Sequence, residues 1–416
     1  MFPTDTDVLV VGAGPTGLAV AIALQQAGVS CVIVDRLNEG QNTSRAAVIH
    51  AHTLETLESI GVAGRLAGLG SKLPSFCVRD RDQKLLDLHF DQLDSSHPYL
   101  LMLPQDQTEA VLTVRLAELG GEIHRGATVS AIEQTDDAVI AVIETPNGTT
   151  RLRARYAVGA DGMHSAVRNA AGLAFEGDSY ADSFVLADVH MDWPIANTEV
   201  SLFFSAAGLV VVAPLPNGSY RIVATMSDAP EKPGVADIQS MLDNRGPTTA
   251  PTTIKDVIWS SRFRVHHRLA NAYRNGRLFV VGDAAHVHSP AGGQGMNCGL
   301  VDACVLGQLL SDVVTNKRPQ SALDAYEALR RPAASQVLTL AGRLTALATM
   351  DSGIKRTIRN TVFRIINRVG PIKHRLMQNL SGLGRKKAAI LPPLPNDQAM
   401  RSVTELTQGA KPRLAN

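Results

Sequence analysis

The first 35 residues alternate between short apolar runs and a glycine-rich break. Residues 8–11 and 31–34 are uninterrupted apolar runs, which is typical of strands buried on both faces of a sheet. Residues 18–27 have helical composition and follow a turn rich in glycine. The pattern therefore predicts a strand, a tight turn, a helix and a second buried strand in one βαβ unit.

The middle of the chain mixes helical and alternating patterns. Residues 53–60 and 108–119 have the composition and apolar spacing expected for helices. Residues 75–90 resemble short strands with polar alternation. Two more strands are predicted at 128–134 and 138–144, where short polar turns separate the apolar alternation.

The pattern changes to long strand-like stretches over residues 184–264, where only 238–244 has a helical period. A Pro-Asn-Gly sequence at 216–218 predicts a hairpin turn in this region. A buried-strand pattern returns at 277–281, and it is followed by a long helix through residue 310 and a mostly helical tail. This order predicts a separate, sheet-based domain between two parts of an α/β domain.

Charge and composition exclude two classes of protein. The chain of 416 residues has a net charge of +1, from 40 lysines and arginines against 39 aspartates and glutamates. This balance argues against a nucleic-acid-binding protein, which should have a basic excess on at least one domain. A share of 45% hydrophobic residues argues against a disordered chain, and with only 4% aromatic residues the core is expected to be aliphatic.

The cysteines and the N-terminus bear on the location of the protein. The four cysteines form neither a CxxC pair nor a metal-ligand spacing, so a dithiol redox site and a zinc site are not expected. The first seven residues carry no basic residue and so lack the charged region of a signal peptide. Residues 8–27 are uncharged over the length of a membrane span, but glycines and a proline interrupt them. We therefore expect a soluble, cytoplasmic protein.

The turn after the first strand has the G-x-G-x-x-G pattern of a dinucleotide-binding site. In this pattern Gly12 allows the tight turn, Gly14 lets a pyrophosphate approach the backbone, and Gly17 lets the helix pack on the strand. The helix N-terminus offers unpaired N–H groups to phosphates, and Asp35, after the second strand, can accept hydrogen bonds from a ribose diol. The unit predicts an adenine dinucleotide and leaves NAD and FAD both open.

Two later motifs join the first. One is the segment GADGMHSAVR around Asp161, and the other is the segment GDAAHVHSPAGGQGMNCG, which contains Asp283. In this order and spacing the three motifs resemble the single-component FAD-dependent aromatic hydroxylases, which are the p-hydroxybenzoate hydroxylase-like group A flavoprotein monooxygenases. Arg45 in a Ser-Arg-Ala segment and Gln105 before a helix add to the match, which covers about residues 7–338.

This resemblance implies an α/β fold in which a Rossmann-like (GR2-type) FAD-binding domain carries an inserted, mainly antiparallel β-sheet substrate domain, followed by C-terminal helices. The expected boundaries are 1–74, 98–178 and 265–340 for the discontinuous FAD-binding domain, 75–97 and 179–264 for the substrate domain, and 341–416 for the C-terminal helical region and tail. The thioredoxin-like domain of longer relatives has no room in this chain, so the resemblance is to the short form.

The resemblance also implies how FAD is held. Asp283 would accept hydrogen bonds from the ribityl or ribose hydroxyls, and Met296 and Asn297 would lie against the isoalloxazine. Glycines at 292–295 would offer N–H groups to the flavin carbonyls, and Arg45 would contact a pyrophosphate or the nicotinamide cofactor. The expected cofactor-binding residues are Gly12, Gly14, Pro15, Thr16, Gly17, Asp35, Arg36, Arg45, Gln105, Asp161, Gly162, Gly282, Asp283, Pro290, Gly293, Gly295, Met296 and Asn297.

The implied activity is that of an FAD-dependent, NAD(P)H-consuming monooxygenase that hydroxylates an aromatic or polycyclic small molecule through a flavin C4a-hydroperoxide. NADPH or NADH would be the reductant and O₂ the co-substrate, in a monomer or homodimer that binds neither a metal nor nucleic acid. Chemistry is expected mainly from the flavin. The candidate catalytic residues are Pro290, Gly293 and Arg45, and the candidate substrate contacts on the sheet are Phe204, Val211, Ala213 and Arg221.

Other functions on the same scaffold stay open. One is another flavin-dependent oxidoreductase, such as a reductase or a halogenase-like enzyme, and the other is a non-catalytic FAD-binding regulatory protein. Trp193 and Trp259 stand too far apart for the W-x-W-x-I-P signature of flavin halogenases. The intact segment around Asp283 argues against a regulatory protein.

Some candidate residues have simpler interpretations. We interpret the H-x-H pair His286 and His288 as hydrogen-bonded structural histidines rather than metal ligands. Asp161 has an alternative role as an ordinary turn residue. Many relatives have arginine where this chain has His52, so the ion pairing that is usual at that position is in doubt.

Residues 354–369 predict a basic amphipathic helix. A helix of this kind can lie on a membrane surface. We expect instead that its apolar face packs onto the FAD-binding domain and that its basic face is solvated, so that no stable membrane association occurs.

Overall fold

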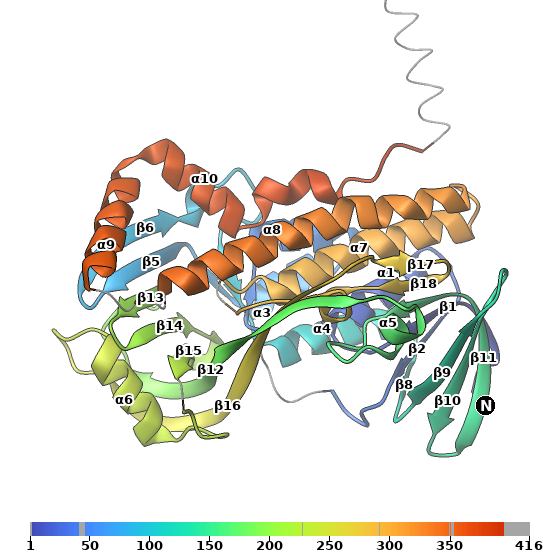
Figure 1. The fold of residues 1–416 in the computed structure, drawn as a ribbon, viewed down its shortest axis with the longest axis horizontal. Coiled ribbons are helices and arrows are strands. Elements are labelled where there is room, and N and C mark those ends of the chain that lie inside the picture. Colours follow the sequence, from blue (N-terminus) through green and yellow to red (C-terminus); the bar gives the residue numbers. More distant parts are fainter. Residues whose placement is uncertain are drawn as a thin grey trace, which may run out of the picture.

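The computed structural model describes residues 2–40, 46–226, 228–290, 292–348, 350 and 353–394, without the side chains at 179–182, 264–265 and 348. Figure 1 shows two sheets at opposite ends of an elongated molecule, with the helix α8 (Asp324–Ala348) extending from one end to the other and α7 (Gly295–Val314) lying beside it over the first sheet. This arrangement has the predicted α/β character and the predicted second sheet.

The first sheet has the strand order β17-β18-β11-β1-β2-β8, in which the strands from β18 to β8 are parallel and β17 is antiparallel to β18. The central strand β1 pairs in parallel with both β2 and β11. Val8, Leu9 and Val10 are fully buried, which confirms the prediction of a strand covered on both faces. The strands of this sheet are β1 (Asp5–Val11), β2 (Cys31–Asp35), β8 (Ile123–Arg125), β9 (Thr128–Gln134), β10 (Val139–Thr145), β11 (Gly148–Gly159), β17 (Arg274–Asn275) and β18 (Leu278–Val280).

One face of this sheet is covered by α1, which packs against α4 and α7. Among the described residues, α7 is long and apolar enough to cross a membrane, but 89% of its apolar window is buried inside the molecule, as in a core helix. The helices and single turns of this part are α1 (Pro15–Gln26), α2 (Ala51–Leu57), η1 (Glu58–Ile60), α3 (Ala63–Leu69), η2 (Phe90–Gln92), α4 (Gln105–Glu118), α5 (Ala166–Ala170), η4 (Gly282–Ala284) and η5 (Gln320–Leu323).

The second sheet has the order β19-β16-β12-β15-β14-β13-β5-β6, and α6 (Val235–Arg245) covers one of its faces. The turn η3 (Pro216–Gly218) joins β14 to β15, which confirms the predicted hairpin. The strands are β5 (Ser75–Asp80), β6 (Gln83–His89), β12 (Phe175–Asp192), β13 (Glu199–Ser205), β14 (Gly208–Pro214), β15 (Tyr220–Met226), β16 (Thr253–Ala270) and β19 (His286–Val287). A third, small sheet consists of β3 (Val48–Ile49), β4 (Ser71–Leu73) and β7 (Leu100–Met102).

The two longest strands connect the two ends of the molecule. β12 and β16 have 18 residues each, and their antiparallel pairing extends from Phe175 opposite Ala270 to Asp192 opposite Thr253. Both strands continue through the expected domain boundaries at residues 178 and 264. The second sheet is therefore attached to the rest of the molecule by paired strands rather than by loops (Figure 1).

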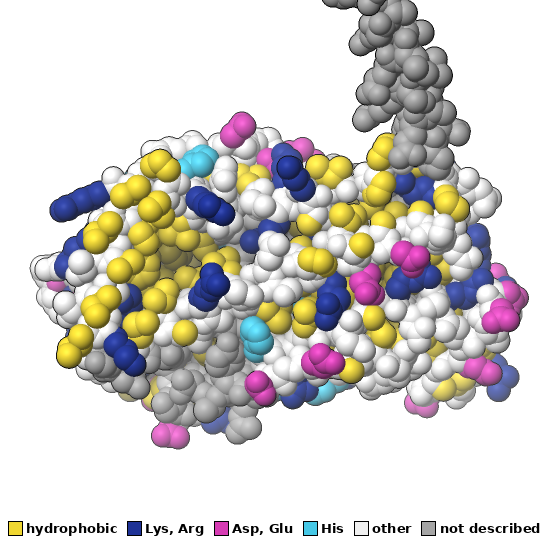
Figure 2. Space-filling view, turned by 45° about the horizontal axis from the view of Figure 1, so that its top comes forward, with side chains coloured by type: hydrophobic (Ala, Val, Ile, Leu, Met, Phe, Trp, Pro, Cys, Tyr) yellow, Lys and Arg dark blue, Asp and Glu magenta, His cyan; other side chains and the backbone are white. Residues whose placement is uncertain are grey.

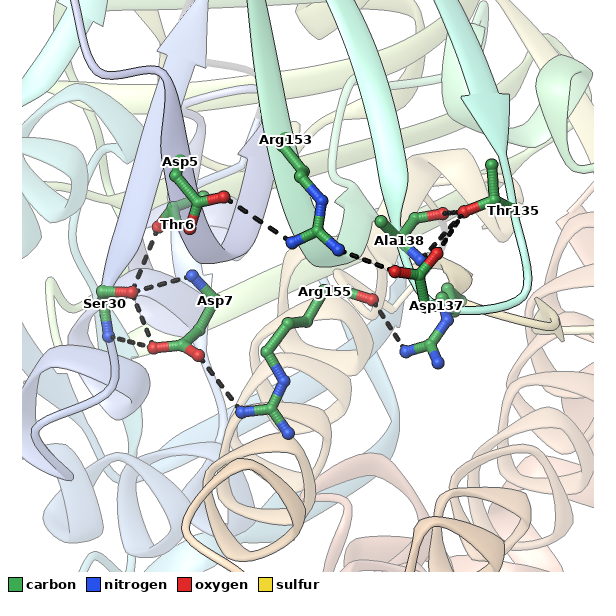
Figure 3. A network of polar contacts seen from close by, with 10 residues as sticks. Asp5, Thr6, Asp7, Ser30, Thr135, Asp137, Ala138, Arg153 and Arg155 are labelled. Carbon is green, nitrogen blue, oxygen red and sulfur yellow. Dashed lines mark hydrogen bonds and ion pairs between the residues drawn. The ribbon is translucent and has the colours of Figure 1, made fainter.

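A polar network ties together the N-terminal ends of the parallel strands (Figure 3). The Ser30 hydroxyl donates to the Asp7 carboxylate over 2.6 Å, and Arg155 Nη1 lies 3.2 Å from the other Asp7 oxygen. Burial acts to raise the pKa of Asp7, but the hydrogen bonds from Ser30 and Arg155 together lower it. Because these contacts lie at the N-terminal edge, they leave the opposite edge of the sheet, where α/β proteins bind ligands, unobstructed.

The C-terminal helices α9 (Gly353–Arg368) and α10 (Gly370–Leu380), followed by the turn η6 (Leu383–Ala389), pack on β6 of the second sheet. The expectation that the apolar face of this region packs onto the FAD-binding domain is wrong. Phe363 points inward, whereas Ile354 and Ile358 are 76% and 58% exposed.

Specific contacts explain this orientation of α9. The Asn360 amide donates to the Asp80 carboxylate over 2.7 Å, and the guanidinium of Arg359 lies 4.6 Å from the centre of the Phe204 ring. The side-chain oxygen of Asn367 accepts from the backbone N–H of Asp87 over 3.0 Å. These polar residues fix which face of the helix meets the sheet, so the row of isoleucines is left outside.

Candidate active site

The dinucleotide turn leaves no room for side chains at two of its glycines. Gly12 has a φ of +101°, and a Cβ there would lie 2.3 Å from the carbonyl oxygen of Ala160. A Cβ at Gly17 would lie 1.9 Å from the carbonyl oxygen of Gly12. At Gly14, by contrast, a Cβ would meet nothing within 4 Å. Gly14 is the N-cap of α1 and supplies no side-chain cap, so the amides at the start of this helix face open space.

Asp35 at the end of β2 orders this turn. Its carboxylate accepts hydrogen bonds from the N–H of Ala13 over 2.7 Å and from the N–H of Leu37 over 2.8 Å. Both contacts hold the carboxylate at the C-terminal edge of the sheet. The prediction that Asp35 also receives a ribose diol is compatible with this position, because each carboxylate oxygen can accept more than one hydrogen bond.

The start of α4 lies beside this turn. Gln105 accepts from the N–H of Ala46 over 3.3 Å and donates to Glu109 over 2.9 Å. Burial raises the pKa of Glu109. The adjoining segment 41–45 lies outside the described residues, and so does the predicted contact Arg45.

Asp161 and the Gly282–Ala284 turn meet at the same edge. Asp161 caps α5 by accepting from the N–H of Ala166 over 2.7 Å, and burial raises its pKa against these hydrogen bonds. Arg168 of α5 donates to the carbonyl oxygen of Ala284 over 3.0 Å. The second and third sequence motifs are therefore bonded to each other, and Asp161 has a structural role as well as a place at this edge.

The loop before α7 has a constrained backbone. Gly292 and Gly293 have φ values of +87° and +60°, and a Cβ at Gly293 would lie 2.1 Å from a methyl group of Val48. α7 begins at Gly295 without a side-chain cap. The unpaired amides of its first turn are therefore directed toward this edge of the molecule.

Asn297 braces this loop from behind. Its side-chain oxygen accepts from the N–H of His50 over 2.8 Å, and its amide donates to the carbonyl oxygens of Val48 and Gly293, each over 2.8 Å. Asn297 is 4% exposed. Its side chain thus has a bracing position that differs from the contact with the isoalloxazine implied by the resemblance.

One cavity of about 1100 Å³ extends from the dinucleotide turn to the second sheet. The predicted cofactor-binding residues that line it are Gly12, Gly14, Pro15, Thr16, Asp35, Arg36, Gln105, Asp161, Gly162, Asp283, Pro290, Gly293, Gly295 and Met296. Gly17, Gly282 and Asn297 are not among its lining residues. Its other end is lined by all of the predicted substrate residues, Phe204, Val211, Ala213 and Arg221.

Comparison with known proteins identifies the family. A family model described as an FAD binding domain matches residues 5–341. The 6-methylpretetramide 4-monooxygenase of Streptomyces rimosus is 34% identical over 395 residues, which cover 92% of this chain and 70% of the relative. The chain belongs to the FAD-binding monooxygenase family.

Other members of this monooxygenase family are similar in sequence or in structure. Pentachlorophenol 4-monooxygenase of Sphingobium chlorophenolicum is 33% identical over 341 residues, which cover 80% of this chain and 63% of the relative. The structure of the anhydrotetracycline hydroxylase OxyS from Streptomyces rimosus matches with a TM-score of 0.77 and 32% identity, and the match covers 91% of this chain and 76% of OxyS. The p-nitrophenol 4-monooxygenase PnpA from Pseudomonas putida DLL-E4 matches with a TM-score of 0.84 at 24% identity, which shows a shared fold over 92% of this chain and 99% of PnpA.

The geometry of this monooxygenase fits FAD at the cofactor end of the cavity. The open space above Gly14 and the uncapped start of α1 suit a pyrophosphate. The uncapped start of α7 lines the same cavity and suits a flavin ring on which negative charge develops. One cavity joins the two helix ends, so a single dinucleotide could contact both.

The other end of the cavity is one face of the second sheet. Its lining residues occupy every second position along neighbouring strands, as expected for side chains on a single face. They are Phe76 and Val78 on β5, Leu86 and Leu88 on β6, Val200, Leu202 and Phe204 on β13, Leu209, Val211 and Ala213 on β14, Arg221 and Val223 on β15, and Phe184 and Leu186 on β12. The strand β16 departs from this spacing, because its neighbours Arg262 and Phe263 both line the cavity, together with His266. Sequence reasoning identified only part of this wall, namely Phe204, Val211, Ala213 and Arg221.

The C-terminal helices close this end of the cavity, which the sequence did not predict. The residues that they contribute are Leu340, Arg343, Leu344, Leu347, Phe363, Ile366, Leu376 and Leu380. Phe363 stacks on Phe204 with ring centres 5.9 Å apart, and Phe184 stacks on Phe263 at 5.8 Å. Arg221 is held in place by a two-pronged ion pair with Asp188, at 2.6 and 2.7 Å.

The predicted structural histidine His286 belongs to a buried ion-pair cluster. His286 Nε2 lies 2.7 Å from one oxygen of Asp302, and Arg330 Nε lies 2.6 Å from the other. His286, Cys298 and Asp302 lie close enough together to suggest a metal site. The guanidinium of Arg330 already takes the place that a cation would have beside Asp302, so the cluster is explained as a salt bridge. The interpretation of His286 as hydrogen-bonded is confirmed.

His52 is 6% exposed, and neither ring nitrogen has a hydrogen-bond partner among the described residues. Its Nδ1 lies 3.9 Å from the carboxylate of Glu55, which makes an ion pair only if the ring is protonated, and burial lowers the pKa of His52 to about 4. Glu55, one turn further along, forms an ion pair with Lys386 of η6 at 3.0 Å. The C-terminal turn therefore supplies a permanent cation for Glu55.

We expect the free energy of unfolding to decrease as the pH is lowered from about 6.5 to about 4. Burial lowers the pKa of His50, His52 and His288 to about 4 each, whereas histidine in an unfolded chain titrates near 6.5. In this range the unfolded chain binds protons that the folded chain does not, so the free energy of unfolding decreases by up to about 1.4 kcal/mol per pH unit for each histidine. Chemical denaturation at a series of pH values measures this slope.

A matched pair of variants checks the cause of this dependence. His52→Gln should have a shallower slope than the wild type, and substitution of the surface residue His190 by Gln should leave the slope unchanged. A His52→Gln slope equal to that of the wild type would show that another group controls acid stability.

Proposed function

We propose that this FAD-dependent monooxygenase hydroxylates an apolar aromatic or polycyclic molecule, with NADPH or NADH as reductant and O₂ as co-substrate. The observation that carries the proposal is the single cavity that joins the dinucleotide turn to an apolar sheet face. Relatives named for 6-methylpretetramide, anhydrotetracycline and pentachlorophenol support a substrate of this class.

The residues of the chain hold and shield the reacting groups. When bound, FAD supplies the acceptor for the hydride of the nicotinamide and the means to activate O₂. The amides at the start of α7 would stabilise negative charge on a flavin held at this end of the cavity, and the positive φ of Gly293 would let the backbone approach its ring. The aliphatic and aromatic face of the second sheet excludes water from the place where oxygen is transferred. The rings of Phe204 and Phe363 stack on each other where the second sheet meets α9, and both line the apolar end of the cavity.

The direct test is oxidation of NADPH and NADH by the FAD-loaded protein with a panel of phenols and polycyclic polyketides, with assays for peroxide and product. We expect one compound to accelerate oxidation and to gain an oxygen atom. A product that is reduced without gaining oxygen would favour a reductase. If neither nucleotide reduces the bound FAD, the monooxygenase proposal fails and a flavin-binding regulatory role becomes the better explanation.

The Ala213→Leu variant tests the apolar wall. Ala213 lines the cavity from β14, and a leucine there fills part of the space that the ring of a substrate would need. We expect kcat/KM for the active compound to fall by at least about fivefold, since overpacking of this kind costs roughly 1–3 kcal/mol. FAD content should be unchanged. Ala207→Leu, in the exposed turn between β13 and β14, is the matched control and should behave like the wild type. Wild-type efficiency in Ala213→Leu would place the substrate elsewhere.

A further inference from the structure

The outward sides of α9 and α10 form one continuous apolar stripe. Ile354 is 76% exposed, Ile358 58% and Ile365 55%. The stripe, named here the C-terminal apolar face, consists of Ile354, Ile358, Val362, Ile365, Val369 and Ile372. Ile354, Ile358, Val362 and Ile365 are three or four residues apart within α9, so they lie on one side of that helix, and Val369 and Ile372 continue the exposed apolar residues into the start of α10. Isolated exposed hydrophobic residues are ordinary, but a contiguous stripe of this kind indicates a binding surface.

Among the described residues, α9 and α10 use their other side to pack on the molecule, so the stripe is an additional apolar surface. The opposite side of α9 already packs on the second sheet through Phe363, and α10 packs through Met377 and Leu380. Figure 2 shows hydrophobic side chains around a hollow at the end of the molecule that carries these helices, with Lys and Arg at its margin. Ile366 and Leu376, on the inner side, line the apolar end of the cavity. The face is therefore both exposed and close to the interior site.

The two helices that carry this face have basic residues and no acidic ones. From Gly353 to Leu380 the chain has seven lysines and arginines and no aspartate or glutamate. The exposed ones among them are Lys355, Arg364, Arg368 and Arg375. An acidic or neutral rim would suit other partners, but a basic rim attracts an anionic surface.

We propose that the C-terminal apolar face docks this protein on an anionic lipid surface. The isoleucines and valines enter the boundary between headgroups and acyl chains, and the flanking lysines and arginines bind the lipid phosphates, as in other interfacial amphipathic helices. A second copy of the chain is a poorer occupant, because pairing this face with itself would bring two basic rims together. In the docked orientation the apolar end of the cavity lies next to the bilayer. The expectation of no membrane association depended on an inward apolar face, and that face is outward.

Co-sedimentation of the full-length, FAD-loaded protein with vesicles tests this docking. We expect binding to phosphatidylcholine vesicles that contain phosphatidylglycerol, little binding to phosphatidylcholine alone, and weaker binding as salt is raised. Arg364→Gln and Arg368→Gln should each weaken binding by about fivefold, which is the effect of roughly one neutralised charge near a membrane. The double variant Ile358→Ser with Ile365→Ser should abolish most of the binding while FAD absorbance is retained.

The matched control carries the same change at exposed apolar residues elsewhere. Leu69 and Val114, which are 53% and 54% exposed on α3 and α4, are both replaced by Ser and should leave vesicle binding intact. Absence of binding to phosphatidylglycerol vesicles at physiological ionic strength would overturn the proposal. Equal loss of binding in the control would overturn it as well. A dimer that the Ile358→Ser and Ile365→Ser changes dissociate, without vesicle binding in the wild type, would assign the face to a second copy instead.

Discussion

The Gly14→Val variant should fold normally and purify without most of its FAD. Gly14 has an ordinary backbone conformation, with a φ of −73°, and a Cβ there meets no protein atom within 4 Å. The valine side chain would instead occupy the space that a pyrophosphate needs above the start of α1. Loss of this close approach should weaken FAD binding by at least about 100-fold, or about 3 kcal/mol.

The flavin absorbance of the purified protein and its recovery on titration with FAD measure this effect, and the circular dichroism spectrum reports on the fold. Gly64→Val is the matched control, because a Cβ at this exposed position of α3 also meets nothing within 4 Å. It should keep both fold and flavin. If Gly14→Val retained its flavin, the pyrophosphate would have to lie away from the N-terminus of α1.

The Asp302→Ala variant should be the most destabilised of the substitutions proposed for this protein. Asp302 is fully buried, and its carboxylate joins His286 and Arg330. Its removal leaves a buried guanidinium and a buried imidazole without their common partner, which costs about 3–5 kcal/mol. The melting temperature should fall by several degrees, and bound flavin should be released at a lower temperature, because Asp302 lies on α7, the helix that begins at the glycine loop.

An exposed ion pair of similar length provides the contrast. Arg65 and Glu118 lie 2.7 Å apart, and their side chains are 46% and 38% exposed. Glu118→Ala should hardly change the melting temperature, since water already solvates both charges. If Asp302→Ala and Glu118→Ala lowered the melting temperature equally, the buried Asp302 carboxylate would contribute no more to stability than an exposed ion pair does.

The sequence predicted the cofactor end of the site well because its constraints are local. Gly12, Gly17 and Asp35 act through a turn of fixed backbone geometry, and the same is true of Gly292 and Gly293 before α7. Each of these positions can be recognised within a short window of sequence. Their association at one edge then follows from the parallel order of the strands that precede them.

The substrate end was harder to predict because both faces of the second sheet are apolar. Val211 lines the cavity, whereas its neighbours Val210 and Val212 pack under α6 on the other face. Alternation in polarity is the usual signal for the two faces of a strand, and it is absent where both faces are buried. Four residues that line the cavity were identified, but the sequence could not show, for each strand, which residues face the cavity and which face α6.

The orientation of α9 was mispredicted for a related reason. A rule that buries the more apolar side of a helix cannot take account of Asn360 and Arg359, whose partners Asp80 and Phe204 lie far away in the sequence. These tertiary contacts decide which side faces inward. The same contacts place Phe363 at the end of the cavity. The wrong orientation of α9 and the missed closure of the cavity by the C-terminal helices therefore have one origin.

The long paired strands β12 and β16 have a mechanical consequence. Two paired strands restrain the two ends of the molecule more than a single loop would, and their pairing is interrupted between Ser179 and Ser183, where the register shifts. A hinge movement that changed the distance between the dinucleotide turn and the apolar sheet face would therefore have to deform both strands, and this register shift is where we expect them to bend. Entry of the substrate and release of the product then depend on local movements of the residues that line the cavity.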